Sequence, residues 1–375
     1  MDTLHHLSEA AHMLRRRFHV ALHGIPQYKG NPNTVCQQIT QDCWNGTFFQ
    51  VSTGHFSLFY MRDFGMCVNA LLKLGYKKEV QKTLQFALTC YSRENRITTT
   101  ISKNGACFDV FSYAPDSLAF LLYSLRISHN KELVEIYRPF LEEQTQFFYD
   151  FVLDKETGLV TTKRNFSSIK DHAKRESTCY DNCCLAVVAR EATLLGLKNL
   201  FIRNYSYKKI QEKIKHTFWT GDYFVESASN VVTSKVITNN VITGDANVFP
   251  YWFGIFTNKK MIRQSIAALQ KEKLDQPFPL KYTSSVPKNF FFPLTVVAPN
   301  YEGNSIWMHL GLCYIDVVAS VDRTLALRYV QEYKKQIEKQ KNFLELYGPN
   351  QQPYESLFYY TDAGMLWCSK WLVHY

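Results

Sequence analysis

Apolar residues return every three or four positions along most of the chain, which is the spacing of amphipathic helices. The pattern predicts twelve helices, each about three to six turns long. They span Thr3–Leu22, Asp63–Leu74, Lys77–Tyr91, Pro115–Ser128, Lys131–Phe151, Cys179–Leu195, Lys198–Phe218, Asp245–Phe256, Asn258–Lys271, Asn304–Ala319, Val321–Phe343 and Thr361–Val373.

The connectors between these helices alternate in length. Short ones, such as the one at Gly75, join helices that should lie antiparallel as neighbours. The long ones are Gly24–Arg62, Ser92–Ala114, Val152–Thr178, Trp219–Gly244, Glu272–Gly303 and Leu344–Tyr360. We therefore predict an all-α (α/α)6 toroid of six helical hairpins, formed by residues 1–375 as one domain, with the long loops meeting at one end as a cleft. An open α-solenoid would normally show a sequence period, and none is found.

Composition and charge narrow the expected cellular location and the classes of partner. The 375 residues are 46% hydrophobic and carry a formal charge of +10. No run of 18 apolar residues is present, and the charged segment Met1–Val20 lacks the features of a signal peptide, so we expect a cytoplasmic protein that does not contact a membrane. The basic stretch Lys334–Lys341 mixes charge signs, as solvated helix faces do, and no nucleic-acid-binding motif occurs. The oligomeric state stays open.

Ten cysteines are too few for a disulfide scaffold in a chain of this length, and several lie in apolar helical stretches. We expect reduced, buried thiols. The alternative is a metal site formed by Cys179, Cys183, Cys184 and His172, but their spacing lacks a Cys-x2-Cys pair. We therefore expect no metal and no cofactor.

Carboxylates recur in the long connectors or at their exits, in a chain where acidic residues are the minority. They are Asp63, Asp109, Asp171, Asp245, Glu302 and Glu345. Asp63 and Asp245 have an alternative role as helix N-caps or first-turn residues that satisfy free N–H groups, and Asp171 as a surface ion pair. Glu345 follows a predicted helix end, where a negative charge opposes the helix dipole, so stability does not explain it.

Aromatic residues accompany these carboxylates, among them Tyr60, Tyr301, Trp307 and Tyr347. An aromatic face beside carboxylates and amides suits a sugar ring, which stacks its C–H face and hydrogen-bonds its hydroxyls. The alternative for Trp307 and for Trp252 is that they fill the core.

Four short segments, in this order, resemble motifs of the six-hairpin glycosidases, a group that includes glucoamylases, trehalases, processing α-glucosidases and amylo-1,6-glucosidases. The segments are Tyr60–Phe64, Thr157–Leu159 followed by Ser168–Asp171, Asn300–Trp307 and Phe343–Pro349. In that family, the first contacts the sugar, the second ends in the general acid and the fourth holds the general base. The family's Trp two residues before the acid is Ile169 here.

The resemblance implies a glycoside hydrolase, inverting, that acts on an α-glucoside or small oligosaccharide, with Asp171 as acid and Glu345 as base. Inverting enzymes hold such a pair ~6.5–9.5 Å apart, leaving room for a water. Arg62 and Asp63 would bind the reacting sugar. Further substrate-binding candidates are Tyr60, Asp245, Asn247, Tyr301, Glu302, Asn304, Trp307 and Tyr347. We expect Lys170 and Lys174 to point to solvent, because their charge would oppose protonation of the acid.

Three other functions of the same fold stay open. The first is a carbohydrate-binding protein that has lost catalysis. The second is an epimerase, which would need paired histidines, although His55, His172 and His309 show no such pairing. The third is a lyase, for which Tyr180 and Arg175 are candidates.

Overall fold

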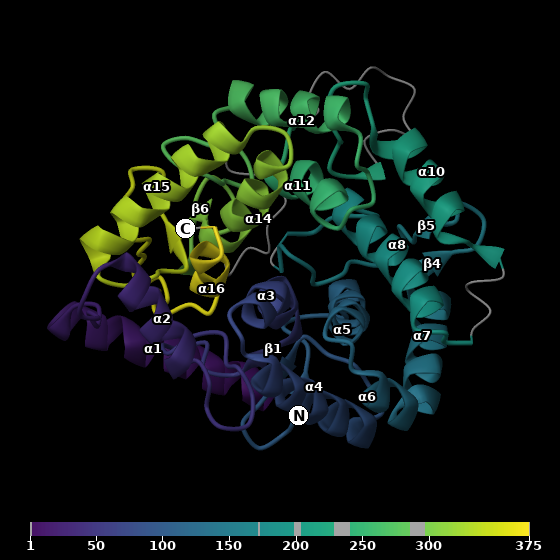
Figure 1. The fold of residues 1–375 in the computed structure, drawn as a ribbon, viewed down its shortest axis with the longest axis horizontal. Coiled ribbons are helices and arrows are strands. Elements are labelled where there is room, and N and C mark those ends of the chain that lie inside the picture. Colours follow the sequence, from purple (N-terminus) through teal and green to yellow (C-terminus); the bar gives the residue numbers. More distant parts are fainter. Residues whose placement is uncertain (1, 172, 199–203, 229–240, 286–296, 375) are drawn as a thin grey trace.

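The computed structural model describes residues 2–171, 173–198, 204–228, 241–285 and 297–374. Six helices form an inner ring and six more surround it (Figure 1), so the predicted all-α toroid is confirmed. The inner helices are α3 (Met61–Lys73), α5 (Pro115–Ile127), α8 (Cys179–Leu194), α11 (Gly244–Trp252), α14 (Met308–Ala319) and α16 (Cys368–Leu372). The outer helices are α2 (Pro32–Asp42), α4 (Lys77–Glu94), α7 (Arg138–Val152), α10 (Tyr207–Phe218), α12 (Lys259–Lys271) and α15 (Arg323–Gln340).

Burial distinguishes the two rings. In inner helix α8, every residue of the range 179–189 is buried, since other helices surround it. Outer helix α10 buries only Ile210, Ile214 and Phe218, a single stripe at four-residue spacing. The core therefore lies between the two rings and among the inner helices.

The long loops all lead into the N-terminal ends of the inner helices. Short antiparallel strands tie them together: β1 (Phe59–Tyr60), β2 (Thr100–Ile101) and β3 (Cys107–Phe108) form one sheet, β4 (Leu153–Asp154) pairs with β5 (Leu159–Val160), and β6 (Ile306–Trp307) pairs with β7 (Leu346–Tyr347). The β6–β7 pair joins two loops that are distant in sequence, next to Glu345.

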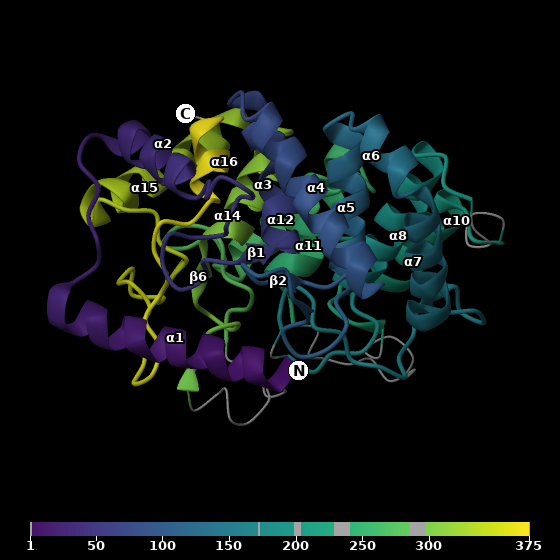
Figure 2. The same cartoon turned by 90° about the horizontal axis from the view of Figure 1, so that it is seen from below.

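The first hairpin differs from the prediction. The segment Thr3–Leu22 was expected in the ring, but α1 (Asp2–His23) lies outside it, along the loop face (Figure 2). The outer helix of that hairpin is α2, inside a stretch predicted to be a loop. Asn31 caps it, since its side chain accepts from the Thr34 backbone N–H, and Pro32 occupies its first position.

Several helix boundaries also differ. The predicted helix Lys131–Phe151 is two helices, α6 (Lys131–Ile136) and α7, because Pro139 favours a new first turn over a helix interior. Two predicted starts were too early, since α14 and α16 begin at Met308 and Cys368. Helix α10 begins at Tyr207, and residues 199–203 of the predicted helix before it lie outside the described residues. Residues 361–367 instead pair with other loops, through Ala363 and Met365.

Within the described residues, no helix has the length and apolar character needed to cross a membrane. All ten cysteines are free thiols and buried. In the same part of the chain, no three His, Cys, Asp or Glu side chains are grouped to hold a metal ion. His172, one member of the alternative metal set, lies outside the described residues.

Candidate functional site

A cavity of about 300 Å³ lies at the N-terminal ends of the inner helices, where the long loops meet. Its lining includes both proposed catalytic carboxylates, which stand far apart in sequence. Eight of the twelve predicted site residues line it: Tyr60, Arg62, Asp63, Asp171, Tyr301, Glu302, Trp307 and Glu345.

Glu345 is 1% exposed and lies just before β7. Three donors reach its carboxylate: the hydroxyl of Tyr301, the hydroxyl of Tyr359 and, at 2.9 Å, the backbone N–H of Asp362. Burial nevertheless raises the pKa of Glu345 to about 8, although these donors lower it. Its carboxyl group therefore changes charge close to neutral pH, as an efficient proton acceptor or donor does.

Asp171 is held by Arg62. The guanidinium donates to both of its oxygens, at 3.1 and 3.0 Å, and the Ser167 hydroxyl donates at 2.9 Å. The same guanidinium donates to Asp116 at 2.6 Å, and Asp116 is completely buried. One positive charge is thus shared by two carboxylates. Burial raises the pKa of Asp116, with the charge of Asp171 adding to that effect.

Asp63 and three ring side chains form another wall of the cavity. Burial raises the pKa of Asp63 to about 6, and Trp367 donates its indole N–H to this carboxylate at 2.9 Å. His309 lies between the rings of Trp307 and Trp367, with centroid distances of 5.0 and 4.7 Å. Burial lowers the pKa of His309 to about 3, so its imidazole is neutral. The wall offers aromatic surface and polar groups to one ligand.

Two predicted residues, Asp245 and Asn247, lie in α11 and are bound to other parts of the fold. Asp245 forms ion pairs with Lys170 at 3.2 Å and Arg175 at 2.9 Å. Asn247 exchanges hydrogen bonds with the Phe224 backbone, accepting at 2.8 Å and donating at 3.0 Å. Neither lines the cavity.

The expectation for Lys170 was wrong. Its side chain is 1% exposed and pairs with Glu226 and Asp245, because the buried carboxylate of Asp245 requires a cation nearby. Lys174 is exposed, as expected.

The last two predicted residues, Tyr347 and Asn304, do not line the cavity. Tyr347 is buried in β7, paired with Ile306, and its ring packs against Phe278 at 5.3 Å. Asn304 lies in the turn that precedes β6. Neither is among the lining residues, so the cavity gives their prediction as substrate contacts no support.

Asp63 and Asp245 lie in the first turns of α3 and α11, as the alternative interpretation expected, but neither is an N-cap. The N-caps of α3 and α11 show no side-chain cap hydrogen bond, and the carboxylates of Asp63 and Asp245 are bound as described above.

The prediction missed several residues of the cavity. Trp367 and His309 lie inside helix patterns, where aromatic residues usually indicate core, and Tyr359 follows a polar loop without any motif. Asp362 was missed as a support: its carboxylate accepts from the backbone N–H groups of His55 at 3.0 Å and Phe56 at 2.9 Å. Only proximity in the fold identifies these residues. Glu9 of α1 also lines the cavity, which no sequence signal indicated.

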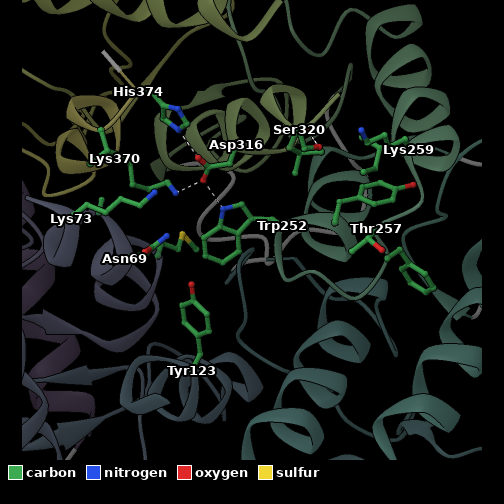
Figure 3. Close-up of a pocket in the computed structure, with 17 residues that line it drawn as sticks. Asn69, Lys73, Tyr123, Trp252, Thr257, Lys259, Asp316, Ser320, Lys370 and His374 are labelled. Carbon is green, nitrogen blue, oxygen red and sulfur yellow. Dashed lines mark hydrogen bonds and ion pairs between the residues drawn. The ribbon is translucent and has the colours of Figure 1, made fainter. Parts of the chain in front are cut away.

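A second cavity, of about 430 Å³, lies at the opposite, C-terminal ends of the inner helices (Figure 3). Asp316 lies at its centre and contacts Lys370 at 2.6 Å, His374 at 2.5 Å and the indole N–H of Trp252 at 2.7 Å. This carboxylate is fully engaged in holding α11, α14 and the C-terminal segment together.

No protein-family model and no curated protein sequence matches this chain. Solved structures do match its fold. A GH63 mannosylglycerate hydrolase from Thermus thermophilus, in complex with Tris, is 11% identical, with a TM-score of 0.62 over 92% of this chain and 99% of that one. A glycosidase variant in complex with glucose is 11% identical, with a TM-score of 0.62 over 97% of both chains. A rhamnosidase from Klebsiella oxytoca with rhamnose bound is 12% identical, with a TM-score of 0.61 over 93% of this chain and 64% of that one.

At these identities, the likeness establishes the fold. The chain therefore has the fold of the six-hairpin glycosidases, as the sequence resemblance implied.

Proposed function

We propose that this protein is an inverting glycoside hydrolase that acts on an α-glucoside or small oligosaccharide. The observation that carries the proposal is one cavity of about 300 Å³ that joins Asp171 and Glu345 to a wall of aromatic rings. The fold shared with sugar-bound glycosidases supports it.

In the proposed reaction, Asp171 gives a proton to the glycosidic oxygen as the bond to the sugar breaks. Glu345 takes a proton from the water that attacks the opposite face of the oxocarbenium-like sugar. Arg62 and Asp63 hold the sugar hydroxyls, and Trp307 offers its ring to the C–H face. The product then carries the inverted anomeric configuration.

The charges around the cavity set a condition on these roles. Glu345 must be ionised to act as base, and the donors Tyr301, Tyr359 and the Asp362 backbone favour that form. Asp171 must carry the proton to act as acid, and the two Arg62 donors oppose this. The proposed role therefore requires that Asp116 becomes the carboxylate that neutralises Arg62 when substrate is bound. Activity should therefore rise with pH as Glu345 ionises, around its pKa of about 8.

The test is a release assay with α- and β-glucosides, maltooligosaccharides, mannosides and rhamnosides, with the product anomer read by proton NMR. The proposal expects β-glucose as the first product from an α-glucoside. An α-anomer as the first product would contradict inversion. Binding of these sugars without turnover would instead support the catalytically inactive alternative.

A further inference from the structure

The N-terminal helix α1 forms part of the same cavity. Glu9, Ala10 and Met13, which lie on one face of the helix, line it together with Asp171 and Glu345. Figure 2 shows α1 running along the loop face beneath β1 and β6, outside the ring of twelve helices. The wall that α1 adds is therefore not part of the toroid itself.

Contacts near its C-terminal half fix α1 in this position. Arg17 donates to the backbone carbonyl of Ser356 at 3.0 Å and pairs with Glu355 at 3.6 Å. Val20 is 6% exposed, and Met13 packs against the core. These contacts hold the Glu9 segment over the cavity.

Glu9 is the polar group that α1 brings to the cavity. Its Oε2 atom is buried and has no hydrogen-bond partner among the described residues. Burial raises the pKa of Glu9 to about 7, partly offset by Lys103. An unpaired buried carboxyl oxygen is unfavourable, and a ligand hydroxyl that bonds to it removes that cost.

The arrangement also limits the size of the ligand. Arg62, Asp63 and Trp307 line the cavity at the ends of the inner helices, whereas Glu9 and Met13 approach from the loop face. The cavity has a volume of about 300 Å³. A substrate whose sugar binds at Asp63 and whose leaving group points to the loop face meets α1 there.

We propose that α1 forms the leaving-group subsite, in which Glu9 binds a hydroxyl of a small polyhydroxylated leaving group and the helix excludes longer chains. This inference rests on the proposed function. It identifies the substrate class as short glycosides, such as a disaccharide, and it assigns Glu9 as a specificity-determining residue.

The experiment compares two substrates that share a glycosyl group. The fluoride of α-glucosyl fluoride is too small to reach α1, whereas maltose places a second sugar there. We expect Glu9→Ala to lower kcat/KM for maltose by about tenfold or more and to change that for α-glucosyl fluoride by less than twofold. Ala10→Trp, which fills the cavity from the same helix face, should act in the same direction.

Ser8→Ala is the matched control, because Ser8 is exposed on the same turn of α1 and does not line the cavity. Equal losses on both substrates, or no loss on maltose, would overturn the assignment.

Calorimetric measurement of glucose and maltose binding distinguishes failure of the leaving-group subsite from failure of the proposed hydrolase function. If the wild type binds both sugars but does not hydrolyse maltose, the subsite is still supported when Glu9→Ala, and not Ser8→Ala, binds maltose more weakly. Unchanged maltose binding, or no binding to the wild type, overturns it.

Discussion

Asp316 and Glu345, at opposite ends of the toroid, are held in opposite ways. At the far end, burial would raise the pKa of Asp316, but the charges of Lys370 and His374 and their hydrogen bonds overcome it and keep that pKa well below its ordinary value. At the loop end, the donors that the described residues offer Glu345 are neutral, and burial raises its pKa to about 8. Two cations thus compensate for the burial of Asp316, whereas the neutral donors of Glu345 leave it able to titrate near neutral pH.

This contrast predicts that the two carboxylates respond oppositely to substitution. The largest effect is expected for Glu345→Gln: a fall in kcat of about 10²–10⁴-fold, since a proton acceptor is lost. The melting temperature should change little, because the neutral amide avoids the burial cost of the charge. Rates and thermal unfolding of the same preparation check this, and a folded variant with unchanged kcat would contradict the role of Glu345.

At the opposite end, Asp316→Asn should destabilise the protein by about 3 kcal/mol. This is the lower end for breaking a buried ion pair, since the Asp316 side chain is 30% exposed. The substitution leaves Lys370, which is 5% exposed, without its counter-charge. Urea unfolding measures the loss, and kcat/KM of the folded fraction should be unchanged.

The pH dependence of that stability gives a second readout. The folded-state pKa of Asp316 is depressed, so its contribution is present above the ordinary pKa of 3.8 and is lost as pH falls through the folded value. The difference in unfolding free energy between wild type and Asp316→Asn should therefore shrink in strong acid. A constant difference would mean that packing, and not charge, accounts for the loss.

A smaller effect is expected from Tyr359→Phe, which removes one donor from the Glu345 carboxylate. The pKa of Glu345 should rise further from about 8, because the ionised form loses a hydrogen bond. The limb of the pH–rate profile on which activity rises with pH should then move upward by about one unit. Tyr354→Phe is the control, since that hydroxyl donates to the Pro299 carbonyl instead. An unmoved limb would show that another group controls it.

The smallest effect is expected at Lys73, an exposed residue that lines the far cavity. Lys73→Ala should change the unfolding free energy by less than about 0.5 kcal/mol and leave kcat/KM unaltered. Steady-state kinetics and urea unfolding check both. A substantial change in kcat/KM would show that the far cavity influences the loop end.

The helical period predicted the toroid well because inner and outer helices both repeat it. It missed α2 within a predicted loop, and it failed for α1, since an amphipathic helix has the same pattern whether it joins the ring or covers the loop face. Only the packing of Glu9, Ala10 and Met13 on the cavity distinguishes the two.

The site was partly predictable for a similar reason. Arg62, Asp63 and Glu345 lie in short motifs and line the cavity, whereas Asp245 has the same loop-exit position but pairs with Lys170 and Arg175. Sequence position places a carboxylate at the loop end but does not say which way it faces. That direction depends on cations contributed by another loop.

The central claim, that Asp171 and Glu345 are an acid and a base across one cavity, is tested most directly by leaving-group dependence. The measurement is kcat/KM of Asp171→Asn and Glu345→Gln on maltose and on α-glucosyl fluoride, which needs no proton to depart. We predict that Asp171→Asn loses maltose hydrolysis by about 10²–10⁴-fold and keeps fluoride release, while Glu345→Gln loses both. The reverse pattern would exchange the two roles, and full activity of both variants on maltose would contradict the two-carboxylate site.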